Sequence, residues 1–295
     1  MDLNEESGMS GEQAATARED TLGLGSVSLH YATWGTLTTP DRVAVLAHGL
    51  TASHREFAAL GPQLAARGWY VVAPDLRGRG LSAKPKRGYN VGVHASDLLA
   101  LCDKLGVERV TLIGHSLGAI IGMYTAALFP ARVARLVMID AGGKIPDDTA
   151  QAIAASVNRL GTVFPSLDAY LTAMSGLPML TWGPFWEQYF RYDADVQSDG
   201  TVISRVPKAA IEEESAALFF TRTEALPEYV KAPTLVARAS VGLLGPEKGV
   251  VLPREEAERL AAVMPDCRWI EIPDSNHYTI VISPAFVDAL TGFLG

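Results

Sequence analysis

The sequence has little cysteine, no run of basic residues and no long hydrophobic stretch, and each shortage excludes a class of protein. Only two cysteines, Cys102 and Cys267, occur in 295 residues, too few for a disulfide framework or a cysteine-based zinc site. The 25 Lys and Arg against 33 Asp and Glu leave a net charge of −8, the wrong sign for a nucleic-acid partner. The longest apolar stretch, 117–129, is too short to cross a bilayer.

Sequence motifs for common cofactors are also missing. No G-x-G-x-x-G follows a predicted strand and no G-x-x-x-x-G-K-[ST] occurs, so we expect no nucleotide cofactor. No H-E-x-x-H or comparable cluster indicates a metal. Residues 1–20 are acidic without an apolar core, which predicts a flexible tail rather than a secretion signal. We therefore expect a cytoplasmic protein that acts on a small molecule with side chains alone, in an oligomeric state that the sequence leaves open.

Apolar runs and helical patterns alternate along most of the chain. Six runs are continuously or almost continuously apolar, at 43–47, 69–73, 110–113, 136–139, 234–237 and 269–272. Such runs are typical of strands buried on both faces of a parallel sheet. Helical patterns lie at 56–67, 91–105, 117–129, 254–263 and 284–294. This alternation predicts an α/β fold with a doubly wound, mostly parallel sheet, and 26–34 predicts an antiparallel strand at its edge.

A long segment interrupts this alternation. Between Asp140 and Pro233 the pattern is helical and rich in aromatic residues, and an insertion of this size after a core strand is typical of a lid. We expect a helical cap at 143–225, and a core formed by 21–142 and 226–295. The side chains of Trp182, Phe185 and Trp186 are predicted to wall a substrate pocket, or else to form the interior of the cap.

The clearest chemical motif is Gly-His-Ser-Leu-Gly at 114–118. It lies between a predicted strand and a predicted helix, the context in which G-x-S-x-G forms a sharp turn with an exposed serine hydroxyl. We predict that Ser116 is a nucleophile. The helix that begins behind it presents free amides to a developing oxyanion.

A second motif, His-Gly-Leu-Thr at 48–51, also follows a predicted strand, and Pro-Asp-Leu-Arg-Gly-Arg-Gly-Leu-Ser follows at 74–82. Together with the serine motif, in this order and spacing, they resemble the α/β-hydrolase superfamily. The resemblance covers 25–142 and 233–295. It implies that the amides of Leu50 and Leu117 form the oxyanion hole, and that the segment at 74–82 is structural.

A serine nucleophile needs a base, and His277 is the best candidate among the six histidines. It follows the last predicted strand, at the sheet end where ligands bind in open α/β folds. The family also places its base last in chain order.

The orienting acid has two candidates, because the segment after the strand 234–237, where family members most often place it, has no aspartate. Asp140 ends an earlier strand, and Glu247 lies in a long loop. We favour Asp140, because it needs no unusual loop geometry and its shorter side chain suits the role, while Glu247 remains the alternative.

With an acid after the earlier strand, the sequence resembles the amidohydrolase subgroup that cleaves acetamidomethylene-succinate. Cofactor-free dioxygenases of the superfamily also have the acid at this position. The residues favour a serine esterase with a Ser116–His277–Asp140 triad, acting on an ester or related acyl bond of a small, partly apolar substrate. Three alternatives stay open: an amidohydrolase with the same triad, a cofactor-free dioxygenase, and a ligand receptor without activity.

Overall fold

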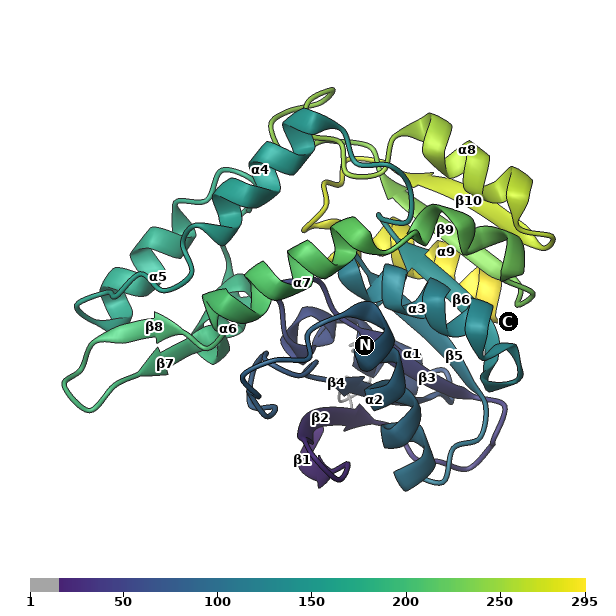
Figure 1. Cartoon of the computed structure of the whole chain (residues 1–295), viewed down its shortest axis with the longest axis horizontal. Helices are drawn as coiled ribbons and strands as arrows, with labels where there is room; N and C mark the ends of the chain where they lie inside the picture. The colour runs from purple at the N-terminus through teal and green to yellow at the C-terminus, as the bar shows by residue number, and fades with distance from the viewer. Residues whose placement is uncertain (1–15) are drawn as a thin grey trace, which may run out of the picture.

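The computed structural model describes residues 16–295, except for the side chains of 155 and 156. Its centre is an eight-stranded sheet with the order β1-β2-β4-β3-β5-β6-β9-β10 (Figure 1). The strands are β1 (Arg18–Gly23), β2 (Ser28–Trp34), β3 (Val43–Ala47), β4 (Tyr70–Pro74), β5 (Val110–His115), β6 (Val133–Ile139), β9 (Thr234–Ala239) and β10 (Cys267–Ile272). From β4 to β10 all neighbours are parallel, whereas β1 and β2 pair antiparallel. The expected doubly wound α/β sheet is confirmed.

Helices cover both faces of the sheet, because its central strands are apolar on both sides. One apolar cluster joins the sheet to α2 (Val91–Lys104), α3 (Leu117–Leu128) and α8 (Arg254–Val263). A second joins the opposite face to α1 (Leu60–Ala65) and α9 (Pro284–Leu294). Short 3-10 turns lie at η1 (His54–Phe57), η2 (Pro130–Arg132), η3 (Thr223–Ala225), η4 (Pro227–Tyr229) and η5 (Ile280–Ile282). In the part of the chain that the structure describes, no helix combines the length and hydrophobicity needed to cross a membrane.

The amino-terminal end of the sheet differs from the prediction. The predicted edge strand, β2, is antiparallel to β4, but β1 lies outside it and forms the edge. Residues 18–20 of the predicted tail belong to β1, and 1–15 lie outside the described residues. The tail boundary at residue 20 is therefore wrong. The strand escaped prediction because its residues are mostly exposed and polar, without the apolar run that indicates a buried strand.

Between β6 and β9 the chain leaves the sheet, and we call residues 143–225 the cap. It contains α4 (Asp147–Val157), α5 (Leu167–Ser175), α6 (Pro184–Asp193) and α7 (Lys208–Phe220). A small hairpin that the sequence did not predict, β7 (Ala194–Val196) and β8 (Val202–Ser204), accompanies them. In Figure 1, α5 and α6 extend beyond the sheet and α7 runs back toward α3.

Candidate active site

Ser116 lies at the sharp turn between β5 and α3. Its φ of 53° is in the left-handed region, which a non-glycine residue adopts only where its surroundings enforce it. The backbone amide of Ser116 donates to the carbonyl of Ile139, at 3.0 Å. A Cβ atom at Gly114 would collide with the carbonyl of Gly118, and one at Gly118 with the carbonyl of Ala47. The two glycines therefore permit the close packing that presents a half-buried serine at the end of the sheet.

The structure brings His277 and Asp140 together. Nδ1 of His277 lies 2.8 Å from Oδ2 of Asp140. The other carboxylate oxygen, Oδ1, accepts a hydrogen bond from the amide of Ala239 at 2.9 Å. Asp140 also has a left-handed φ, 50°, which turns its side chain after β6. Both residues are buried, at 7% and 1% exposure. Burial and the positive charge of His115 lower the pKa of His277 below its usual value, against the opposing effect of Asp140. The imidazole is therefore neutral at pH 7.

Glu247, the alternative acid, lies elsewhere. It is exposed in the loop between β9 and α8, and within residues 16–295 it has no hydrogen bond or ion pair. Strand β9 contributes a backbone amide, that of Ala239, to the histidine–acid pair instead of a carboxylate. Of the two candidates, only Asp140 contacts His277.

The amides of Leu50 and Leu117 are available for an oxyanion. Leu117 is the first residue of α3, and neither amide donates a hydrogen bond to another described residue. Two side chains hold the turn that carries Leu50. Nε of Arg79 donates a hydrogen bond to the carbonyl of Leu50 at 3.0 Å, and the amide of Gly49 donates one to Glu56 at 3.1 Å.

His48 closes the same turn from within. Burial lowers the pKa of His48 to about 4, so its imidazole is neutral at pH 7. Its Nδ1 donates to the carbonyl of Gly49 at 2.8 Å, and its Nε2 accepts the amide of Leu76 at 2.9 Å. The predicted oxyanion turn is thus fixed before any substrate binds, as preorganised electrostatic stabilisation requires.

A second buried pair, Glu56 and His115, lies beside His277 and was missed by the sequence analysis. Oε1 of Glu56 is 2.9 Å from Nδ1 of His115, and the rings of His115 and His277 are 4.5 Å apart between centroids. Burial opposes a charge on His115, but the Glu56 carboxylate outweighs it and raises the pKa of His115. The serine motif leaves the residue at position 115 unspecified, and Glu56 lies in no motif. The sequence therefore gave no indication that the two residues form a pair.

The predicted pocket aromatics belong to an apolar cluster of the cap. Trp182 and Phe185 are half-buried and pack against it, whereas Trp186 is one of its buried members, at 4% exposure. Tyr278, which follows His277, packs against the same cluster. The side chain of Leu50 packs against a different cluster of the cap, formed by Leu160, Val206 and Ile211. The pocket assignment stays a prediction, and the burial of Trp186 favours its alternative role in the cap interior.

The cap also contains a half-buried cation that the sequence analysis did not identify. Arg159 has a side chain 19% exposed, and its Nη1 lies 3.7 Å from Oδ2 of Asp193. Burial opposes its charge, but Asp193 and three tyrosines, among them Tyr278, outweigh this and raise its pKa. The positive charge of Arg159 therefore interacts with Tyr278, the residue that follows His277.

Comparison with known proteins now identifies the family. A family model described as alpha/beta hydrolase fold matches residues 43–284. The chain belongs to this family. The 2-(acetamidomethylene)succinate hydrolase of Mesorhizobium japonicum is 28% identical over 252 residues, which cover 84% of this chain and 86% of that protein. The 3-hydroxybutyrate-oligomer hydrolase of Cupriavidus necator is 28% identical over 282 residues, 86% of this chain and 88% of that protein.

A solved structure, that of E-2-(acetamidomethylene)succinate hydrolase, superposes with a TM-score of 0.84. The match covers 95% of this chain and 99% of that one at 24% identity, and so shows a shared fold. The resemblance to the acetamidomethylene-succinate subgroup is confirmed. This alpha/beta hydrolase is an enzyme, and its class is hydrolase.

Proposed function

We propose that this hydrolase cleaves a carboxylic ester or related acyl bond of a small, partly apolar substrate through a Ser116–His277–Asp140 triad. The observation that carries the proposal is the buried imidazole–carboxylate pair, 2.8 Å apart, in a fold whose strand-to-helix turn holds a serine at a left-handed φ. A serine at this turn and a histidine oriented by an acid are the parts that acyl transfer needs.

In the proposed reaction His277 accepts the proton of the Ser116 hydroxyl as the oxygen attacks the substrate carbonyl. Asp140 accepts a hydrogen bond from the Nδ1–H of His277 and remains ionised, which holds the reactive tautomer and stabilises the imidazolium. The amides of Leu50 and Leu117 stabilise the tetrahedral oxyanion. His277 then donates its proton to the leaving group, and water, activated by the same imidazole, releases the acid from Ser116.

A second candidate is the amidohydrolase with the same triad. It is supported by the relative from Mesorhizobium, whose name specifies an acetamido compound bearing a succinate. The cap adds a half-buried cation, Arg159, which suits an anionic substrate. The relative from Cupriavidus, named for hydroxybutyrate oligomers, supports the ester reaction.

One set of measurements tests the proposal. A fluorophosphonate should add once to the protein, and intact-mass spectrometry should find no adduct on Ser116→Ala. A panel of acyl esters of graded length, with matched amides and dicarboxylates, then separates the two candidates. Oxygen consumption without acid release would instead identify a dioxygenase, and a protein that binds but turns over none of these compounds would be a receptor.

A further inference from the structure

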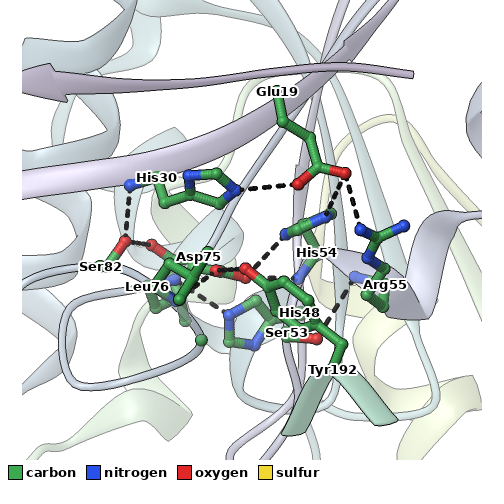
Figure 2. A network of polar contacts seen from close by, with 12 residues as sticks. Glu19, His30, His48, Ser53, His54, Arg55, Asp75, Leu76, Ser82 and Tyr192 are labelled. Carbon is green, nitrogen blue, oxygen red and sulfur yellow. Dashed lines mark hydrogen bonds and ion pairs between the residues drawn. The ribbon is translucent and has the colours of Figure 1, made fainter. Parts of the chain in front are cut away.

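We propose that Glu19, His30 and His54 form a binding site for a divalent transition-metal ion, with Zn²⁺ the best match to the donor set. The three residues come from β1, β2 and η1 and converge at the outer edge of the sheet (Figure 2). This site is separate from the proposed triad and uses none of its residues.

The geometry of the three donor atoms is close to that of a metal site. Nε2 of His30 lies 3.2 Å from Oε2 of Glu19, and Nε2 of His54 lies 3.9 Å from Oε1 of Glu19. All three donors lie within 4.8 Å of one another. Ligands on a tetrahedral zinc ion, with bonds of about 2.0–2.1 Å, are about 3.3 Å apart. Small side-chain rotations, easiest for the half-exposed Glu19, bring the set to this spacing.

The far side of each imidazole is held by a hydrogen-bond partner, so that Nε2 of both rings faces Glu19. Nε2 of His54 has no hydrogen bond within the described part of the chain, and a metal would replace the hydrogen bond between Nε2 of His30 and Glu19. Nδ1 of His54 lies 3.0 Å from Oδ1 of Asp75, and Nδ1 of His30 lies 3.0 Å from the hydroxyl of Thr21. A carboxylate on the distant nitrogen of a ligating histidine fixes its tautomer and increases its basicity, and this arrangement recurs around protein zinc ions. Figure 2 shows Asp75 behind His54, on the side opposite Glu19.

The strongest indication is an atom whose bonding capacity is unused. His54 is 1% exposed, yet its Nε2 has no hydrogen-bond partner among the described residues. Burying a polar atom without a partner is unfavourable. A cation between His54 and Glu19 would satisfy this nitrogen and neutralise the carboxylate at the same time.

Arg55 limits the affinity of the site but does not block it. Its guanidinium donates to Oε1 of Glu19 at 2.7 Å and lies over the ring of Tyr192, 4.9 Å from its centroid. Oε2, on the side of His30, remains for the ion, so Glu19 would bind metal with one oxygen and Arg55 with the other. Water would complete the coordination.

A bound ion would connect the edge strands to the body of the protein. Glu19 and His30 belong to β1 and β2, whereas His54 is joined through Asp75 to Tyr192 of the cap, whose hydroxyl is 2.5 Å from Oδ2 of Asp75. The sequence analysis expected no metal, because these ligands lie 11 and 24 positions apart, outside the short spacings of known zinc motifs. Only the folded chain brings them together.

The experiment is a titration of the full chain with Zn²⁺ against a chromophoric chelator, combined with diffraction data collected at the zinc absorption edge. We expect one ion per chain, and an anomalous peak within about 2.3 Å of Nε2 of His30 and of His54. Glu19→Gln and His30→Gln should each weaken binding at least tenfold. Asp20→Asn, an exposed neighbour with the same change of charge, should leave it unchanged.

The absence of a peak at these atoms in zinc-soaked crystals would overturn the proposal without reliance on any variant. An equal loss in Asp20→Asn and Glu19→Gln would do the same, because it would indicate attraction by surface charge. Zinc should also raise the melting temperature of the wild type but not of His30→Gln. Ester hydrolysis by metal-free protein is expected to persist, so failure of this site leaves the proposed function intact.

Discussion

At the scale of single residues, the candidate site concentrates unusual backbone geometry. Of the described residues other than glycine, only Ser116, Asp140 and Asp274 have a positive φ. Such conformations cost about 1–3 kcal/mol each and persist where the surrounding structure compensates. Here the compensation is a pair of backbone bonds, from the amide of Ser116 to Ile139 at 3.0 Å and from that of Asp140 to Ala237 at 2.7 Å. The same strands that impose the strain therefore aim both side chains at the end of the sheet.

The identity of the acid gives the first prediction. Asp140→Asn should lower ester turnover by about 10⁴-fold, the cost of the same change in a serine protease triad, because the amide favours the wrong tautomer of His277. Glu247 is exposed and has no hydrogen bond to His277 in the described part of the chain, so Glu247→Gln should cost less than about tenfold, or ~1.4 kcal/mol. Both variants are assayed with one ester after circular dichroism shows that they are folded. A damaged Glu247→Gln beside an active Asp140→Asn would return the acid to the loop after β9.

The charge on His115 gives the second prediction. Because this charge lowers the pKa of His277, its removal in His115→Gln should raise that pKa. The acidic limb of kcat/KM, set by protonation of His277, should therefore move to higher pH. The glutamine amide can still donate to Glu56, so the pair keeps a hydrogen bond. The measurement is a pH profile of kcat/KM with a neutral ester, with Asp20→Asn as control. An acidic limb that stays at the same pH or moves to lower pH would show that His115 carries no charge.

At the scale of elements, α7 attaches the cap to the core through buried charges. The carboxylate of Glu214 accepts a hydrogen bond from Nη2 of Arg79 at 2.5 Å and lies 2.9 Å from Nε2 of His94 on α2. None of the three side chains is exposed to solvent. Arg79 in turn donates to the carbonyl of Leu50. The contact that fixes the cap therefore also supports the predicted oxyanion turn, which couples the attachment of α7 to the geometry of the site.

Glu214→Gln should accordingly destabilise the protein by roughly 3–5 kcal/mol, because it leaves the Arg79 guanidinium buried without a counter-charge. Turnover should fall as well, since Arg79 would no longer be held against Leu50. Glu212→Gln is the matched control: it lies on the same helix, loses the same charge and is exposed, with Lys208 4.0 Å away. It should change the unfolding free energy by less than about 0.5 kcal/mol. Urea unfolding compares the two, and equal effects would show that the buried network contributes nothing specific.

At the scale of the whole molecule, three of the buried carboxylates, those of Glu56, Asp75 and Glu214, are held in the ionised form by their partners. Burial alone would raise the pKa values of Glu56, Asp75 and Glu214. The charge and hydrogen bond of His115, the hydrogen bond of His54, and the hydrogen bond of His94 with the charge of Arg79 outweigh it and lower the three pKa values in turn. A carboxyl whose pKa is lower in the folded state stabilises the protein in full above its unfolded value. That stabilisation is lost as the pH falls through the folded value.

The protein should therefore lose stability in acid. The unfolding free energy should begin to fall near pH 4.5, the unfolded value for glutamate, and keep falling toward pH 2. Urea titrations at pH 7, 5, 4 and 3 measure this, and Asp75→Asn, with one of these carboxylates removed, should show a shallower dependence. A wild type equally stable at pH 5 and pH 3 would contradict the assignment of these groups as ionised.

The sequence by itself determined the local structure and the parts of the site that follow from it. The apolar runs of β3, β4, β5, β6, β9 and β10, the glycines around Ser116 and the position of His277 after the last strand are short-range patterns. Each apolar run predicted its strand closely. These features were readable because strand burial and the serine turn depend on neighbours in the chain.

Tertiary structure decided which distant residues meet. Asp140 and Glu247 were both possible acids because they follow β6 and β9, which are adjacent and parallel and thus end at the same edge of the sheet. Only the folded chain orients one of them toward His277 and pairs Glu56 with His115. It likewise formed β1 from exposed residues and gathered Glu19, His30 and His54. Such contacts depend on the packing of whole elements, which no local pattern encodes.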